Sequence, residues 1–208
     1  RYYYSHMLRI KTSSRVKDFY ALETKSSSRS DESLNAFAHT LPAGFAGWHH
    51  LSQAQFVEAK SLLSGYLLSS QGDRMAAANA VEGRYPFLDH RVIEFAAQIP
   101  PQHKLFGLKE KWVLKRAMRG ALPEAILKRP KQPYMAPDSN CFTQKQSPEY
   151  VRQLLSPDRI KRAGVFNPVM AGKLYEKCLK QSQVQMSFKD NMAFVGILST
   201  QLLVDQFI

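Results

Sequence analysis

Residues 80–91 of the chain read AVEGRYPFLDHR, and the interpretation of the whole sequence depends on this stretch. It places a carboxylate, Glu82, and a guanidinium, Arg84, two positions apart and just before an apolar Tyr-Pro-Phe-Leu turn. Because proline fixes the backbone φ angle, the turn is stiff. The two charged residues form either an ion pair that holds a helix end or part of a reaction site. The local pattern leaves both interpretations open.

The composition is typical of a globular domain. The chain has 208 residues, of which 44% are hydrophobic and 11% aromatic, and this length is sufficient for a sizeable core. No apolar run approaches the ~18 residues of a membrane span, so no membrane contact is expected. Cys141 and Cys178 have no CxxC spacing and cannot form a disulfide framework, which favours a reducing, cytoplasmic location. The six histidines have no zinc-ligand spacing, and no metal-ligating residues are expected.

The chain is strongly basic, with 29 Lys and Arg against 17 Asp and Glu and a net charge of +12. Nine basic residues and two acids lie between Lys104 and Lys131. Such a concentration favours contact with nucleotide phosphates, nucleic acid or an acidic partner. A solvated helical surface would explain the same residues without a ligand. Lys131 follows Pro130 on a stiff turn, which suits a phosphate contact, although an ordinary exposed loop has the same sequence.

Capping residues and prolines predict a mostly helical chain. Ser-Pro, Ser-Pro and Asn-Pro pairs at positions 147, 156 and 167 each predict a helix start. Asp89 is expected to cap a helix that ends before Pro100. Ser52 begins a capping-box pattern.

Further helices are expected at about 109–119, between residues 123 and 130, and from about 190 to the end, where the apolar composition predicts burial. No alternating strand pattern is present. We predict two segments. Residues 1–53 form an N-terminal helical and loop segment with a mobile Ser-rich loop near 24–33, and residues 54–208 form a helical C-terminal part.

Three ordered strings resemble the synthetase half of the glutamine-dependent asparagine synthetases, whose relatives include β-lactam synthetases. They are VEGRYPFLD at 81–89, KWVLK at 111–115 and RPKQ at 129–132. The strings at 190–193 and 196–201 also resemble the bacterial branch of that family. The resemblance covers residues 54–208. It implies that the mostly α chain is the C-terminal helical part of an α/β synthetase domain that is adenine-nucleotide-hydrolase-like and carries a pyrophosphate-binding (PP) loop.

The resemblance also implies a reaction. A substrate carboxylate, aspartate by family default, attacks ATP with Mg²⁺ present and releases pyrophosphate. Ammonia then displaces AMP to form an amide. By motif match, Lys131 contacts the pyrophosphate, Glu82 lies beside the adenylate, and Glu110 corresponds approximately to a further catalytic acid. Arg84, Lys111 and Asp73 are expected to bind substrate or ATP pyrophosphate. Arg84 is also expected to hold Glu82.

The sequence departs from the family in two respects. The Ser-Gly-Gly-x-Asp-Ser PP-loop is absent from the 208 residues, and so is the N-terminal Cys that hydrolyses glutamine. The chain also starts with Arg1 rather than Met, so we expect a fragment, a split subunit or a chain that has lost catalysis. Its expected partners are a PP-loop half and a glutaminase domain, on the same or another chain. Two alternatives stay open: a non-catalytic helical scaffold and a basic helical nucleic-acid-binding module. Self-association is also left open.

Overall fold

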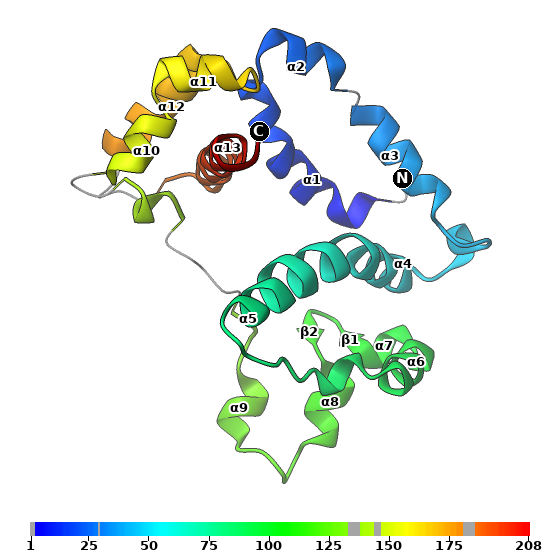
Figure 1. The fold of residues 1–208 in the computed structure, drawn as a ribbon. Helices are drawn as coiled ribbons and strands as arrows, with labels where there is room; N and C mark the ends of the chain where they lie inside the picture. Colours follow the sequence, from blue (N-terminus) through cyan, green and yellow to red (C-terminus); the bar gives the residue numbers. More distant parts are fainter. Residues whose placement is uncertain (1–2, 29, 133–137, 144–146, 181–185) are drawn as a thin grey trace. The chain divides into compact units, whose positions relative to one another are not determined.

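A computed structural model describes residues 3–28, 30–132, 138–143, 147–180 and 186–208. Helices dominate these residues, and their β-structure comprises one short two-stranded sheet and two isolated bridges (Figure 1). The prediction of a mostly α chain is confirmed. The chain forms two compact units, which we describe separately. Unit 1 comprises residues 1–6 and 41–133, and unit 2 comprises residues 7–40 and 134–208.

Unit 2 is built from helices at both ends of the chain. Its elements are α1 (Met7–Ser13), η2 (Ser14–Phe19), α2 (Leu22–Ser27), α3 (Ser30–His39), η6 (Asp138–Cys141), α10 (Glu149–Leu154), α11 (Pro157–Ala163), α12 (Pro168–Lys180) and α13 (Phe188–Phe207). Backbone hydrogen bonds join the two ends of the chain: Asn167 donates to the carbonyl of Phe19 at 2.8 Å, and Ala21 donates to that of Val165 at 3.0 Å.

The core of unit 2 surrounds α13. Phe194, Ile197 and Leu198 on this helix are buried together with Val151 and Ile160. Helices α10, α11 and α12 and the segment η2 all contact α13, and Figure 1 shows this helix nearly end-on. The predicted C-terminal helix is confirmed, and the face that carries Phe194, Ile197 and Leu198 is buried, although Phe207 near its end is 76% exposed.

Unit 1 follows a different plan. Its elements are η1 (Tyr4–His6), η3 (Phe45–Gly47), α4 (His50–Glu58), η4 (Ala59–Asp73), α5 (Arg74–Ala78), η5 (Pro86–Leu88), α6 (His90–Gln98), α7 (Pro101–Lys104), β1 (Leu105–Phe106), β2 (Lys109–Glu110), α8 (Trp112–Ala117) and α9 (Glu124–Lys128). The segments α4, η4 and α5 follow one another without a break. Within them η4 has π-helical bonding; the N–H of Arg74, for example, donates to the carbonyl of Ser69.

Unit 1 buries little apolar surface. Among the described residues, Phe45 and Val57 are its buried hydrophobic side chains. Phe45 contacts the rings of Trp48 and Phe56, with centroids 5.3 Å and 5.7 Å away. Many other large apolar side chains are exposed: Tyr66, Leu67, Met75, Val81, Tyr85, Phe87, Val92, Ile93, Phe95, Leu105, Phe106, Leu108, Val113, Leu114, Leu122 and Ile126. Among the described residues, unit 1 thus buries far fewer apolar side chains than unit 2 does.

Three local predictions are corrected. Of the Ser-rich stretch expected as a loop, residues 24–27 form the end of α2 and residues 30–33 the start of α3. The hydroxyls of Ser26 and Ser27 donate to the carbonyls three residues earlier, so they are accommodated within a helix. The helix expected from Ser52 begins at His50, because the ring of His49 accepts the N–H of Leu51 and acts as the cap.

The helix expected at 109–119 begins only at Trp112, because residues 109–110 form a strand. The unit boundaries fall after residues 6, 40 and 133 rather than near residue 53. Whether 1–53 and 54–208 act as separate parts of a synthetase domain stays a prediction. Among the described helices, none is both long and apolar enough to cross a bilayer.

Candidate functional site

The candidate site begins at the β1–β2 hairpin of unit 1. Leu105 pairs with Glu110 and Phe106 with Lys109, and Gly107 takes a positive φ of 59° in the connecting turn. Lys111 follows with a φ of 55°, a left-handed conformation that turns the chain from β2 directly into α8. This turn was not predicted, because Lys rarely adopts a positive φ. Its consequence is that Glu110 and Lys111 lie where the hairpin meets the helix.

The other wall of the site is α9 and the turn that follows it. Gly120 turns the chain after α8 with a φ of 82°. Pro123 precedes α9, and Pro130 follows its end, as the proline pattern predicts. The RPKQ string therefore leaves α9 as a short non-helical segment beside α8.

A cavity of about 270 Å³ lies between these walls. Its lining includes five apolar side chains, namely Leu114, Met118, Leu122, Ile126 and Leu127. Polar residues and a proline complete the lining, namely Glu110, Lys111, Lys115, Arg129, Pro130, Lys131 and Gln132. The charged lining residues are thus four cations and one carboxylate. A concave site with an apolar base and a cationic lining is suited to an anionic ligand with an organic part.

Hydrogen bonds tie the two walls together. The backbone N–H of Lys131 donates to Oε1 of Glu110 at 2.9 Å. Nζ of Lys115 donates to the carbonyl of Arg129 at 3.3 Å and lies 4.0 Å from the same Glu110 oxygen. Two of the three family-like strings, separated by more than a dozen residues, therefore meet at one cavity.

Of the predicted site residues, Glu110, Lys111 and Lys131 line this cavity, whereas Glu82, Arg84 and Asp73 are not part of its lining. Glu82 and Arg84 form an ion pair of 2.6 Å with both side chains at least 80% exposed. The expected contact between Arg84 and Glu82 is confirmed. Asp73 is the last residue of η4. The catalytic and binding roles of all six residues stay predictions.

The VEGRYPFLD string has a fixed backbone shape. Residue 80, an alanine, has a positive φ of 53°, and Val81 donates to the carbonyl of Ala76 at 2.9 Å. A Cβ on Gly83 would lie 2.4 Å from the hydroxyl of Tyr85 and nearly as close to its ring, so a larger residue would displace that ring. The glycine between Glu82 and Arg84 therefore leaves room for the Tyr85 side chain.

Asp89 caps α6 as predicted. Its carboxylate accepts the backbone N–H of Arg91 at 2.9 Å and the Arg91 guanidinium at 2.8 Å and 3.0 Å. These bonds lower the pKa of Asp89. The bidentate contact between the Asp89 carboxylate and the Arg91 guanidinium was not predicted. An acid two residues before an arginine at a helix start is a usable signal for it.

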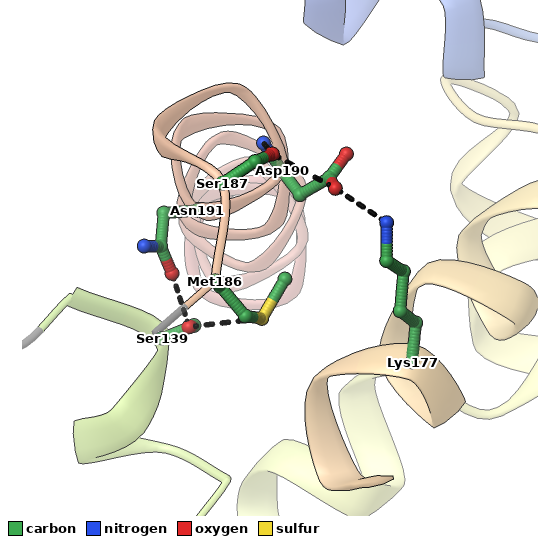
Figure 2. Close-up of polar contacts among 6 residues, drawn as sticks. All are labelled: Ser139, Lys177, Met186, Ser187, Asp190 and Asn191. Carbon is green, nitrogen blue, oxygen red and sulfur yellow. Dashed lines mark hydrogen bonds and ion pairs between the residues drawn. The ribbon is translucent and has the colours of Figure 1, made fainter. Parts of the chain in front are cut away.

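The string at 190–193 has a structural role at the start of α13 (Figure 2). Asp190 accepts from Nζ of Lys177 at 2.6 Å and from the hydroxyl of Ser187 at 2.9 Å, which joins α12 to α13. Ser139, which is fully buried, donates to Asn191. Burial raises the pKa of Asp190, but the bonds from Lys177 and Ser187 outweigh it, and the net pKa is lowered.

The buried cysteine does not mark a reactive site. Cys178 lies in the core of unit 2, where burial and the nearby Asp190 carboxylate raise its thiol pKa to about 12. Within the described ranges, no three His, Cys, Asp or Glu side chains lie together as a metal site would require.

Two cavity residues were missed as site candidates: Lys115 and Arg129. Lys115 is the last residue of the KWVLK string, and its place in that string was the usable signal. Arg129 could be identified only from its place beside Lys131.

Comparison with known proteins identifies the family. The model of the family described as asparagine synthase matches residues 4–203. The chain belongs to the asparagine synthase family. This family comprises amidotransferase-type ligases. The match begins well before residue 54, so the resemblance extends over more of the chain than the sequence strings indicated.

Similar curated proteins agree with this assignment. The chain is 35% identical over 96 residues to amidase chyE of Penicillium rubens, which covers 43% of this chain and 14% of that protein. It is 32% identical over 116 residues to glutamine-hydrolyzing asparagine synthetase 3 of Bacillus subtilis, covering 54% of this chain and 18% of that protein. Amidase chry2 of Gibberella zeae is 29% identical over 96 residues, which cover 43% of this chain and 14% of that protein. The chain thus spans less than a fifth of the length of these relatives. No solved structure matches the chain.

Proposed function

We propose that this chain is part of an ATP-dependent, glutamine-using amidotransferase. The enzyme adenylates a small-molecule carboxylate, aspartate-like by default, and transfers ammonia to it, releasing AMP and pyrophosphate. The observation that carries the proposal is the cationic cavity between α8 and the RPKQ turn, since two family-like strings build it together.

Lys131 is proposed to bind the pyrophosphate portion of ATP. The lining of the cavity fits that group: Lys111, Lys115, Arg129 and Lys131 supply positive charge, and the carboxylate of Glu110 already accepts a hydrogen bond. Fixed cations stabilise charge that develops on a leaving pyrophosphate, and a Lys ammonium is a compact donor for this purpose. ATP would supply the activated α-phosphate. Mg²⁺ usually binds through substrate phosphates and few carboxylates, so it needs no dedicated cluster in this chain.

Glu82 is proposed as the carboxylate that lies beside the adenylate and takes a proton from the attacking ammonia. Arg84 donates to one of its oxygens at 2.6 Å, and both side chains are exposed. A general base must lie within hydrogen-bond reach of the proton that it removes. In β-lactam-forming relatives a Tyr stands here, so Glu82 favours amide formation between two molecules. Asp73 is proposed to contact the substrate or the pyrophosphate of ATP.

The PP-loop must come from outside these 208 residues, because the sequence lacks it. The exposed apolar side chains of unit 1 support this requirement, since a partner surface would cover them. We propose that the partners are the PP-loop half and a glutaminase domain, on the same or another chain. We place the reaction in the cytoplasm because Cys141 and Cys178 are free thiols.

The test is Lys131→Ala in the complete enzyme, assayed by ATP–pyrophosphate exchange. We expect exchange to fall by a factor of about 100 or more, the scale at which loss of one electrostatic donor acts, with glutaminase activity retained. Lys128→Ala is the matched control. Lys128 lies near Lys131 in the sequence, but it is not part of the cavity lining and pairs with Glu124 at 3.4 Å. Normal exchange in Lys131→Ala would refute the pyrophosphate role.

Two assays separate the alternatives. In the exchange assay, a non-catalytic scaffold combined with the PP-loop half would show no change with either lysine variant. In a binding assay, a nucleic-acid-binding module would bind DNA or RNA with an affinity that falls steeply with salt concentration. Neither alternative explains why the cations gather around an apolar cavity.

A further inference from the structure

Glu110 has an unexpected position for an acid. It is the one carboxylate in the lining of a cavity whose other charged lining residues are four cations. A carboxylate beside a bound anion repels it, so charge alone would make Glu110 unfavourable for phosphate binding. The hydrogen bonds suggest a different reason for its presence.

The turn around Pro130 lacks regular secondary structure, and two of its backbone groups are bonded to side chains. The carbonyl of Arg129 accepts from Nζ of Lys115, and the N–H of Lys131 donates to Oε1 of Glu110. These two groups flank Pro130, which has no N–H of its own. Residues from β2 and α8 therefore hold the turn on both sides of the proline.

We infer that Glu110 is a positioning residue for Lys131. Its oxygen fixes the peptide that carries Lys131, and the ammonium is thereby presented to the anion in the cavity. Lys115, whose Nζ lies 4.0 Å from that oxygen, offsets the charge of the carboxylate. This inference rests on the proposed function. It also replaces the acid–base role that motif matching suggested for Glu110.

Two substitutions separate positioning from charge. Glu110→Ala removes both the acceptor oxygen and the charge, whereas Glu110→Gln keeps an acceptor oxygen at nearly the same place and removes the charge alone. The complete enzyme is titrated with inorganic pyrophosphate and followed by calorimetry. Hydrogen exchange at the Lys131 amide is measured in parallel, and circular dichroism checks the fold. Glu110→Ser serves as a second truncation if the alanine variant loses helical signal.

We expect Glu110→Ala to weaken pyrophosphate binding about three- to tenfold, the effect of losing one solvent-exposed hydrogen bond of ordinary strength. The Lys131 amide should exchange faster by a similar factor. Glu110→Gln should rescue both properties and, by removing a negative charge, bind pyrophosphate at least as tightly as the unchanged chain.

Equal weakening in both variants would overturn the inference, because charge would then matter rather than the acceptor. Unchanged binding in Glu110→Ala would overturn it as well. In the complete enzyme, loss of amide formation in Glu110→Gln with pyrophosphate exchange retained would establish the acid–base role instead. Lys131→Ala keeps the two proposals distinct: if that variant binds pyrophosphate normally, the proposed function fails, whatever Glu110 does.

Discussion

Units 1 and 2 differ in how they bury apolar side chains. Unit 2 has a continuous core around α13, in which Phe194, Ile197 and Leu198 are almost fully buried. Unit 1 carries all the predicted site residues, yet most of its large apolar side chains are exposed. A core supplies most of the stability of a domain. The difference teaches that the buried apolar surface of the described residues lies mainly in unit 2, whereas the unit with the site leaves most of its own exposed.

The largest effect is expected in the core of unit 2. Phe194→Ala should lower the free energy of unfolding by about 3–5 kcal/mol, because it removes a buried ring and leaves a cavity. Phe194 is 2% exposed and stacks on Tyr175 with centroids 6.1 Å apart. Urea unfolding followed by circular dichroism measures the change. The matched control, Phe207→Ala, lies on the same helix but is 76% exposed, and its effect should stay within about 0.5 kcal/mol. Similar losses in both variants would contradict a core centred on α13.

The second effect concerns the open surface of unit 1. Phe95 on α6 is 68% exposed, so Phe95→Ala should change the stability of the chain alone by no more than about 0.5 kcal/mol. Binding to the PP-loop half should weaken by about 1.5–3 kcal/mol, the value of burying one phenylalanine. Calorimetric titration of this chain with the PP-loop half measures the change in binding free energy. Phe207→Ala, from unit 2, is a similarly exposed control. Identical affinities for the two variants would remove the argument that unit 1 is the docking surface.

The third and smallest effect is electrostatic. Asp190 is 13% exposed, and its lowered pKa means that its charged form stabilises the fold of unit 2. That contribution is present above the carboxyl's unfolded pKa of about 4 and disappears as the pH falls through the lower folded value. Asp190→Asn should therefore cost about 1 kcal/mol at pH 7. The difference from the unchanged chain should shrink on acidification. A difference that is constant from pH 7 to about pH 3 would show that the ion pair with Lys177 is not its cause.

Local signals predicted the helices best. Asn167 accepts the N–H of Met170 at 3.0 Å, and Asp89 accepts that of Arg91, as their positions before a helix suggested. Proline and capping residues act within a few positions, so the sequence shows both partners. The late start of α8 was missed because no local sequence signal marks it. The left-handed conformation of Lys111 has no local signature, because it depends on the hairpin before it.

Long-range arrangements were beyond sequence patterns. The bond between Glu110 and Lys131 spans 21 positions, and nothing in the spacing says that β2 returns to the turn after α9. The pairing of Phe19 with Asn167 in unit 2 is more distant still. The resemblance identified the strings that carry the chemistry, but the cavity they form required the folded chain.

The central claim is that Lys131 and Glu82 serve one nucleotide. A crystal structure of the complete enzyme with a non-hydrolysable ATP analogue tests it most directly. We predict that the Lys131 ammonium lies within about 3 Å of a β- or γ-phosphate oxygen and that the Glu82 carboxylate faces the α-phosphate. A triphosphate bound away from the cavity between α8 and the RPKQ turn, or a Glu82 carboxylate directed away from the nucleotide, would contradict the claim.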